Sequence, residues 1–347
     1  MFIGMIRPSV LVTGGAGYVG SHVCKALRQA GYEPVAFDDL CTGHAALVRH
    51  GPLIIGDVRD AAAVEEAIRR TRPVACLHFA ARSTTPESVL DPLTYYQVNV
   101  SGTLVLLRAL LDSGVTALVF SSSCAVYGEP ATLPVPEAAA QAPVSPYGRS
   151  KAMVEQMLCD GAAAYGLRCV ALRYFNAAGA DPAAELGELH DPELHVIPRA
   201  LMVAAGIIPA FDLRGSDYPT RDGTAVRDYT HVADLARAHV AALQYLLAGG
   251  GTVALNLGLG RGHSVREVVQ AVERSTGKPV RLSLADRRAG DAAEIVADPS
   301  SAARVLGFQP RLRRLETMVE TAWNFLRSQP DHLERLRLRH AATAAAD

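Results

Sequence analysis

The stretch SVLVTGGAGYVGSH, residues 9–22, decides the fold of this chain. An apolar run of strand character passes directly into a glycine-rich turn, and a helical pattern follows. Gly14 permits a tight turn, Gly17 lets the backbone approach a pyrophosphate, and Gly20 allows a helix to pack closely on a strand. This order predicts a dinucleotide-binding βαβ unit with phosphates at the helix N-terminus.

Alternating strands and helices continue through the first half of the chain. Apolar runs predict strands at 34–39, 53–57, 74–80, 117–123 and 168–176, and helical patterns lie at 61–71, around 92–113 and from about 147. Strands that are apolar throughout and separated by helices indicate a parallel sheet covered on both faces. The predicted fold class is α/β, a Rossmann-type doubly wound parallel sheet with a smaller C-terminal α/β substrate domain.

The composition of the sequence changes after Asn176, where Gly, Pro, Asp and His become frequent. We expect a cofactor domain over residues 1–176, with segments near 226–258 returning to it. Residues 177–335 form the predicted smaller domain, and residues 336–347 are expected to be a flexible tail.

Composition excludes several classes of protein. The net charge is −1, so no overall basic field favours nucleic acid. No apolar run is long enough for a membrane span, and the N-terminal residues read as a lead-in to the first strand rather than as a secretion signal. The six cysteines are scattered without paired spacing, so we expect reduced thiols in a cytoplasmic protein.

The carboxylate of Asp38 lies eighteen residues beyond Gly20, at the end of the second predicted strand. A carboxylate there accepts hydrogen bonds from ribose hydroxyls and repels a 2′-phosphate, so NAD is favoured over NADP. Asp57 and the HFAA turn at 78–81 follow the next two strands and reach the same carboxyl edge of the sheet.

The run SPYGRSK, residues 145–151, places Tyr147 and Lys151 four positions apart after Pro146. If Pro146 begins a helix, the two side chains share one face. A nearby ammonium stabilises a phenolate, so Tyr147 could act as a general base. Taken alone, the pair is equally typical of an ordinary surface contact.

The order of glycine turn, strand-end serine and YxxxK resembles the extended short-chain dehydrogenase/reductase superfamily, with Ser123 of FSSSCAVYG as the matching serine. The chain further resembles the UDP-glucose (UDP-galactose) 4-epimerase family. The segments that carry this resemblance include VTGGAGYVGSH, NVSGT, SPYGRSK, RYFNAAGA, VRDYTHVADLA and RRAGD, and the resemblance covers about residues 10–325. Related dehydratases carry an Asp-Glu pair where this chain has Cys124 and Ala125, which argues against dehydration.

The resemblance implies an NAD-dependent isomerase that interconverts UDP-glucose and UDP-galactose through a transient 4-keto sugar. Ser123, Tyr147 and Lys151 are the implied catalytic residues. Cofactor contacts are implied for Gly14, Gly17, Tyr18, Val19, Gly20, Asp38, Asp39, Leu40, Cys41, Thr42, Gly43, Asp57, Val58, Phe79, Ala80, Ala81, Ser83, Asn99, Tyr147, Lys151, Tyr174 and Phe175.

The resemblance also implies how the UDP-sugar is held. Arg227 and Arg288 correspond to cations that neutralise the diphosphate, and guanidinium groups suit phosphate oxygens. An ordinary salt bridge of Arg227 to Asp228 or Asp234 is the alternative interpretation. The full implied set of substrate contacts is Ser123, Tyr147, Asn176, His195, Arg214, Arg227, Arg288, Asp291 and Ile295.

Three positions depart from the family pattern. Ser83 replaces a lysine that often touches the cofactor, and Arg82 beside it is a possible substitute. Arg214 stands where an aromatic often packs near uracil. Ile295 occupies a gate at which a large tyrosine excludes N-acetylhexosamines, and its intermediate size leaves the preferred sugar open.

Two other interpretations remain open at this stage. The enzyme could be a 4-epimerase of another UDP-sugar, such as an N-acetylhexosamine, pentose or uronate, or the chain could be a non-catalytic NAD-binding regulator. The run GELHDPELHV, residues 187–196, contains ligand residue types, but its spacing matches no ligand framework, so we expect no metal. By resemblance, the helices near 92–113 and after Tyr147 pair with their copies in a homodimer.

Overall fold

The computed structural model of the chain describes residues 7–288 and 290–344, without the side chains of 341–344. The expected lead-in over the first six residues lies outside this range. A central sheet of seven parallel strands confirms the predicted Rossmann-type fold. Its order is β3-β2-β1-β4-β5-β6-β10. The strands are β1 (Ser9–Thr13), β2 (Glu33–Asp38), β3 (Leu53–Ile55), β4 (Ala75–His78), β5 (Ala117–Ser123), β6 (Arg168–Tyr174) and β10 (Val253–Leu257).

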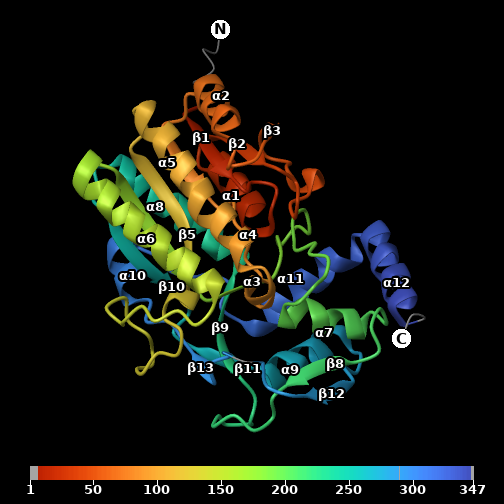
Figure 1. The fold of residues 1–347 in the computed structure, drawn as a ribbon. Helices are drawn as coiled ribbons and strands as arrows, with labels where there is room; N and C mark the ends of the chain where they lie inside the picture. The colour runs from red at the N-terminus through yellow and green to blue at the C-terminus, as the bar shows by residue number, and fades with distance from the viewer. Residues whose placement is uncertain (1–6, 289, 345–347) are drawn as a thin grey trace.

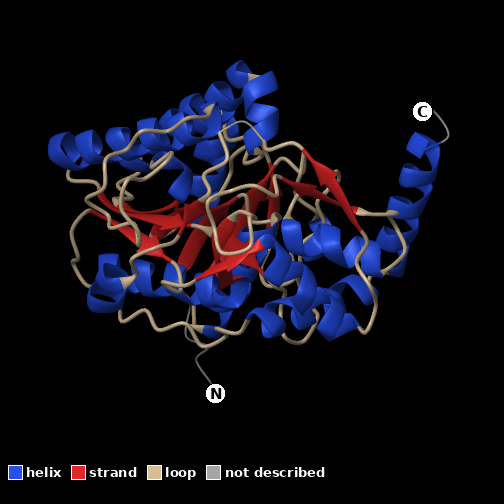
Figure 2. Cartoon of the chain, turned by 90° about the horizontal axis from the view of Figure 1, so that it is seen from below, coloured by secondary structure: helices blue, strands red, loops and turns tan. Residues whose placement is uncertain are grey.

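Helices cover both faces of this sheet, as Figure 2 shows. Alternate residues of β1 point to opposite faces, because side chains in a strand alternate. Val10 and Val12 pack in one core with α1 (Tyr18–Gln29) and α8 (Val232–Leu247). Leu11 packs in the other core, which includes residues of α2 (Ala61–Thr71), α5 (Gly102–Asp112) and α6 (Pro146–Tyr165). Each face therefore buries its own apolar layer.

The second half of the chain builds smaller sheets beside the first (Figure 1). One sheet joins β7 (Asn176–Ala178), β9 (Val226–His231), β11 (Gly262–Ser264) and β13 (Glu294–Ile295), and β8 (Phe211–Arg214) pairs with β12 (Leu282–Ala285). A separate core forms between these strands and the helices α7 (Val196–Ala204), α9 (Val265–Thr276) and α11 (Leu315–Arg327).

Segments late in the chain return to the main sheet. α8 packs against α1, and β10 pairs with β6 at the sheet edge. α10 (Ser300–Leu306) lies against both, a return that the sequence did not reveal. β9, at the start of the expected return segment, belongs instead to the smaller sheet.

Two expected elements differ in the structure. The helix expected around 92–113 is divided into α4 (Pro92–Tyr96), a π-turn (Gln97–Ser101) and α5, with the short α3 (Thr85–Leu90) before it. The expected tail over 336–344 is instead the end of α12 (Pro330–Ala344), because Leu336 is buried at 3% exposure in the second core. Residues 345–347 of that tail lie outside the described range. No described helix is both long enough and apolar enough to cross a membrane.

Candidate active site

The glycine turn after β1 is shaped by close backbone contacts. Gly14 has a φ of +70°, and a Cβ on it would lie 2.6 Å from the Ala80 nitrogen. A Cβ on Gly20 would lie 2.2 Å from the Gly14 carbonyl oxygen. Both positions therefore exclude larger residues, as the sequence predicted.

The first turn of α1 offers free backbone donors. Gly17 is the N-cap residue, and no side chain caps this end of the helix or places an acid in its first turn. The N–H groups beginning at Tyr18 and Val19 therefore suit a pyrophosphate. The Tyr18 side chain points elsewhere, since its hydroxyl donates to the Gly179 carbonyl at 2.5 Å.

The carboxylate of Asp38 lies at the end of β2, beside the glycine turn. It accepts hydrogen bonds from the backbone nitrogens of Ala16 and Leu40, each at 2.9 Å. Burial raises the pKa of Asp38, and these two bonds oppose that rise. A Cβ on Gly43 would lie 2.7 Å from the Asp38 carboxylate, so the loop after β2 closes over it. Ala16 and Leu40 thus fix the carboxylate in place for a ribose.

The other expected cofactor residues fall around the same carboxyl edge. Asp57 follows β3 and pairs with Arg59 at 2.5 Å. Phe79, Ala80 and Ala81 follow β4, and Asp39, Leu40, Cys41, Thr42 and Gly43 form the loop after β2. Tyr174 ends β6, where its hydroxyl bonds that of Ser121, and Phe175 is buried directly after it.

Asn99 is buried and supports the loop after β4. Its amide nitrogen donates to the Arg82 carbonyl and to the Ser150 hydroxyl, each at 2.9 Å, while its oxygen accepts from the Arg82 nitrogen at 2.8 Å. These bonds use both of its donors. Ser83, next in that loop, is exposed, and the Arg82 guanidinium lies 3.7 Å from Glu87.

Two elements bring the expected catalytic residues together. β5 ends at Ser123, and α6 begins at Pro146, as predicted, with the Ser145 hydroxyl capping the Gly148 nitrogen. Tyr147 lies in the first turn of α6, near enough to Ser123 for that side chain to lower the pKa of its phenol. The Lys151 ammonium lies 5.8 Å from the centre of the Tyr147 ring. The strand-end serine and the YxxxK pair therefore form one cluster.

Burial dominates the electrostatics of this cluster. It raises the pKa of Tyr147 to about 12, and the nearby Ser123 side chain opposes the rise. It lowers the pKa of Lys151 to about 7, and the Glu155 carboxylate opposes that change. The Lys151 ammonium donates to the Ser121 carbonyl at 2.8 Å and lies 4.8 Å from the centre of the Phe120 ring. Proton transfer by Tyr147 near neutral pH thus requires further positive charge at the site.

A buried ion pair beneath the cluster escaped the sequence reasoning. Glu155 of α6 pairs with Arg173 of β6 at 2.5 Å, and both side chains are 7% exposed or less. The Glu155 carboxylate also accepts from Ser122 and from Gln141, at 2.5 and 2.8 Å. Arg173 in turn donates to the Tyr127 hydroxyl at 2.8 Å. The spacing of Glu155, four residues after Lys151, was the available signal.

Two expected substrate residues, Arg227 of β9 and Asp291, lie close together beside the smaller sheet. The Arg227 guanidinium lies 3.9 Å from the Asp291 carboxylate. Asp228 instead accepts from backbone nitrogens, including that of Leu259 at 2.9 Å, and Asp234 pairs with Arg237. The ordinary salt bridges considered for Arg227 are therefore not formed.

Other substrate-side residues lie near this sheet. Asn176 begins β7, whose neighbour is β9. Ile295 is the register partner of Arg227, and its side chain packs with Val126 and Phe175 near Ser123. The Asp291 nitrogen donates to the Arg288 carbonyl at 3.1 Å, which brings those two residues into one turn.

Arg214 and Arg287 are half-exposed. Arg214 lies 4.0 Å from Asp212 at the end of β8. Arg287 pairs with Asp217 at 2.7 Å and stacks over Tyr218.

His195 stands in a cluster that its sequence spacing did not predict. Its Nδ1 lies 2.7 Å from Glu188 and 2.9 Å from Glu193, directly before α7. His190 lies in the same cluster, with its Nδ1 2.7 Å from Glu188. Because the carboxylates of Glu188 and Glu193 are largely buried, the cluster is part of the folded structure and not a chance contact between surface side chains.

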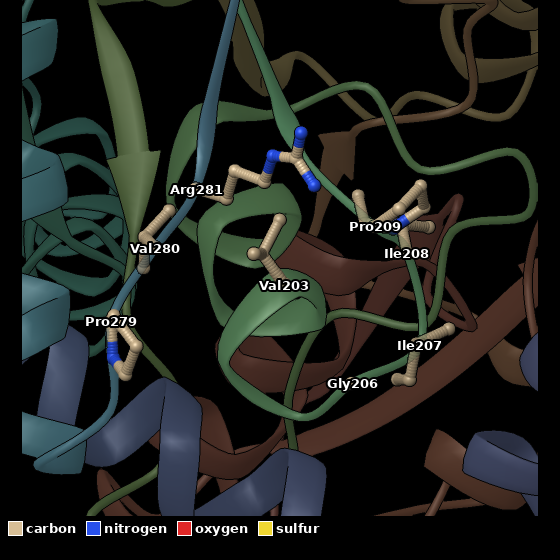
Figure 3. A pocket seen from close by; sticks show the side chains of 8 residues that line it. All are labelled: Val203, Gly206, Ile207, Ile208, Pro209, Pro279, Val280 and Arg281. Carbon is tan, nitrogen blue, oxygen red and sulfur yellow. The ribbon is translucent and has the colours of Figure 1, made fainter.

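An apolar hollow also lies away from these residues (Figure 3). It lies between the end of α7 and the segment before β12, and it contains none of the expected site residues. Its lining is Val203, Gly206, Ile207, Ile208, Pro209, Pro279, Val280 and Arg281.

The fold and the site together define the class of the extended short-chain dehydrogenases and reductases. A seven-stranded parallel sheet carries a glycine turn and Asp38 at one switch point, with Ser123, Tyr147 and Lys151 on the neighbouring strand and helix.

Comparison with known proteins narrows this class. Residues 10–258 match the model of the NAD dependent epimerase/dehydratase family, and the chain belongs to that family. A curated protein of Rhizobium meliloti (strain 1021), named UDP-glucose 4-epimerase, is 50% identical over 92% of this chain and 98% of its own length.

Solved structures agree with this assignment. The UDP-glucose 4-epimerase of Brucella ovis, in complex with NAD, superposes with a TM-score of 0.90 at 52% identity, covering 92% of this chain and 98% of that one. A UDP-glucose-4-epimerase of Stenotrophomonas maltophila, with NAD and formylated UDP-arabinopyranose, also gives 0.90, at 43% identity over 94% of this chain and 99% of that one. The close superposition over nearly full length covers both halves of the molecule.

Proposed function

We propose that the protein is an isomerase, an NAD-dependent 4-epimerase that interconverts UDP-glucose and UDP-galactose through a transient 4-keto sugar. The observation that carries this proposal is the convergence of Ser123, Tyr147 and Lys151, where β5 ends and α6 begins, at the carboxyl edge of the sheet. An idle binding protein has no need of all three groups.

The residues of the first half suit NAD. The free N–H groups of α1 face the pyrophosphate position, and the fixed carboxylate of Asp38 suits an adenosine ribose. In this proposal, Lys151 and Tyr147 hold the nicotinamide ribose. NAD, when bound, supplies the acceptor and then the donor of the hydride at C4, together with a positive charge.

Tyr147 performs the proton transfers in this mechanism. Its phenolate removes the proton from the sugar 4-hydroxyl, and its phenol later returns a proton to the 4-oxygen when the hydride is returned to the opposite face of C4. The Ser123 hydroxyl bonds the reacting oxygen, and its side chain lies near Tyr147. The Lys151 ammonium favours the phenolate of Tyr147, which offsets the rise in the pKa of Tyr147 to about 12 that results mainly from burial.

In this proposal, the protein binds the UDP part of the substrate firmly and the sugar only loosely. Arg227 and Arg288 neutralise the diphosphate, Asp291 bonds the uridine ribose, and Asn176 donates to a phosphate or sugar oxygen. The ion pair of Arg227 with Asp291 is long, at 3.9 Å, so a phosphate readily replaces it. A firmly held UDP and a loosely held hexose allow the keto sugar to turn over between the two hydride transfers.

The preferred sugar is the part of the proposal for which other UDP-sugars are close alternatives. Ile295 is buried at 6% exposure beside Val126 and Phe175, and a side chain of this size leaves more room than tyrosine. UDP-pentoses and UDP-N-acetylhexosamines are therefore the competing substrates, and the neighbour with a UDP-arabinopyranose derivative makes the pentose worth testing.

A direct assay tests the proposal. The purified protein is incubated with UDP-galactose, and the product UDP-glucose is separated by anion exchange. Parallel reactions with UDP-N-acetylgalactosamine and UDP-arabinose rank the sugars. We expect UDP-galactose to be converted fastest. An enzyme with bound NAD that converts no UDP-sugar would overturn the assignment.

We extend the proposal to the organisation of the protein. The cofactor domain comprises residues 1–176 and the segments near 226–258 that return to it, and the UDP-sugar domain comprises the remainder of 177–335. Leu104 of α5 and Met153 of α6 are 60% and 46% exposed, which supports a homodimer through these helices. Light scattering should give twice the chain mass. The scattered cysteines support a cytoplasmic location.

A further inference from the structure

Four ligand-type side chains converge just before α7. Glu188, His190, Glu193 and His195 each place one ligand atom within 4.8 Å of all the others. The Nδ1 atoms of both histidines lie 2.7 Å from the same Glu188 oxygen. Only eight residues of chain supply the whole set.

The two carboxylates are held in place. Glu188 and Glu193 are 10% and 5% exposed at the side chain. One Glu193 oxygen accepts from the backbone nitrogens of Leu194 and His195, each at 2.7 Å. The histidines are freer, with side-chain exposures of 31% for His190 and 56% for His195. The cluster therefore combines two buried, fixed carboxylates with two solvent-accessible imidazoles that are free to adjust.

We propose that Glu188, His190, Glu193 and His195 form a binding site for one divalent transition-metal ion, with Zn²⁺ the best match. Two imidazole nitrogens and two carboxylate oxygens are ligand types that zinc accepts in a tetrahedral shell. A dication balances two carboxylates while the imidazoles stay neutral. The site shares His195 with the implied substrate contacts, but it contains none of the implied catalytic residues.

The geometry requires a small expansion on binding. Metal–ligand bonds of about 2.0–2.1 Å place tetrahedral ligands about 3.3 Å apart. The present nitrogen–oxygen separations of 2.7–2.9 Å are those of hydrogen bonds, in which the imidazole N–H donates to a carboxylate. The ion would replace these N–H protons, which pass to solvent. The exposed His190 and His195 are free to withdraw by the half ångström required.

The position of the site suggests what an ion would do. The His190 ring contacts the Tyr18 ring edge-on, with centroids 6.5 Å apart. Tyr18 belongs to the first turn of α1, and its hydroxyl bonds Gly179. A bound ion would hold the segment before α7 against the cofactor turn and so stabilise the folded chain.

The test uses the untagged chain, dialysed against EDTA and then titrated calorimetrically with ZnCl₂. We expect one ion per chain, and a melting temperature that rises with Zn²⁺. His190→Ala and Glu193→Gln should each weaken Zn²⁺ binding by roughly tenfold or more, because even outer-shell partners matter to that extent. His340→Ala, which alters a histidine of α12 outside the cluster, is the matched control and should bind as the parent does.

A second measurement does not depend on variants. Co²⁺ added to the parent chain should give the visible bands of a four-coordinate nitrogen and oxygen site, without a thiolate charge-transfer band from Cys41 or Cys159, the two exposed cysteines. Failure to bind one Zn²⁺ per chain, equal affinity in His190→Ala, or a thiolate band would each overturn the proposal and leave the cluster as a hydrogen-bonded brace.

Discussion

The two halves of the site differ in how their polar groups are held. At the catalytic edge, Glu155 and Arg173 form a buried pair at 2.5 Å, and Lys151 is 3% exposed. On the substrate side, Arg227 and Asp291 are 3.9 Å apart, with Asp291 37% exposed. In the proposed mechanism, the first arrangement fixes atoms for proton transfer. The second leaves cations available, because weak exposed pairs are easily exchanged for a phosphate.

The largest effect should come from the catalytic edge. Tyr147→Phe removes the phenolic proton and keeps the ring, so turnover of UDP-galactose should fall roughly 10²–10⁴-fold, the usual contribution of a positioned acid or base. Binding of UDP should survive, because the substrate-side residues are untouched. Steady-state rates and UDP titration check this, and a variant that kept near-parental turnover would show that another group transfers the proton.

Breaking an ion pair should destabilise the protein much more at the catalytic edge than on the substrate side. Arg173→Met leaves the Glu155 charge buried without its partner, so the free energy of unfolding should fall by about 3–5 kcal/mol. Arg287→Met breaks the pair with Asp217, whose side chains are 43% and 73% exposed, and should leave the free energy of unfolding almost unchanged. Urea denaturation measures both.

The double variant Glu155→Leu with Arg173→Met sharpens the same comparison. Replacing both partners removes the uncompensated charge, so part of the lost stability should return. Equal destabilisation by Arg173→Met and Arg287→Met would mean that burial does not distinguish the two regions.

A charge on the substrate side should affect binding more than turnover. Arg227→Met removes a cation from the diphosphate position, and KM for UDP-galactose should rise roughly 10- to 100-fold, since hydrogen bonds to charged groups contribute about 1.5–3 kcal/mol. The change in kcat should be much smaller. Arg287→Met is again the control, with KM expected to stay within a factor of two. A loss in kcat alone would place Arg227 in the chemical step instead.

The catalytic edge and the substrate side also differ in how much of their structure could be predicted from the sequence. All six of the first strands in the main sheet were predicted, because a continuous apolar run and a glycine turn are local signals. The start of the Tyr147 helix was predicted from Pro146, whereas Ser123 was assigned from the family resemblance. α10 was not assigned to the sheet, since its packing on β10 depends on contacts with residues far away in the chain.

The misses on the substrate side have a common physical cause. The ligand atoms of Glu188, His190, Glu193 and His195 meet through an irregular loop, and no periodicity encodes such a path. The expected flexible tail became α12 because Leu336 finds a partner core formed by other helices, which local composition does not reveal. Tertiary burial decided both cases.

The histidines of the two halves continue the comparison, with the smallest expected effect. His190 and His195 face carboxylates, whereas His239 packs between Phe79 and Tyr174, and its Nε2 has no hydrogen-bond partner among the described residues. Burial lowers the pKa of His239 to about 4, below its ordinary 6.5. The unfolded chain therefore binds a proton between these pH values that the folded chain refuses, so stability falls as pH drops from 6.5 towards 4.

His239→Leu removes the group that takes up this proton in the unfolded chain. The free energy of unfolding should therefore fall less steeply below pH 6.5, by up to about 1.4 kcal/mol per pH unit, with little change at pH 7.

His78→Leu is the contrasting variant. Burial also lowers the pKa of His78, to about 3, but its ring bonds the hydroxyls of Thr13 and Thr103 at 2.6 and 2.8 Å. That variant should lose about 1–3 kcal/mol at pH 7, because two buried hydroxyls lose a partner. Urea unfolding at pH 7, 6 and 5 measures both variants, and an unchanged slope in His239→Leu would show that His239 is protonated in the folded chain.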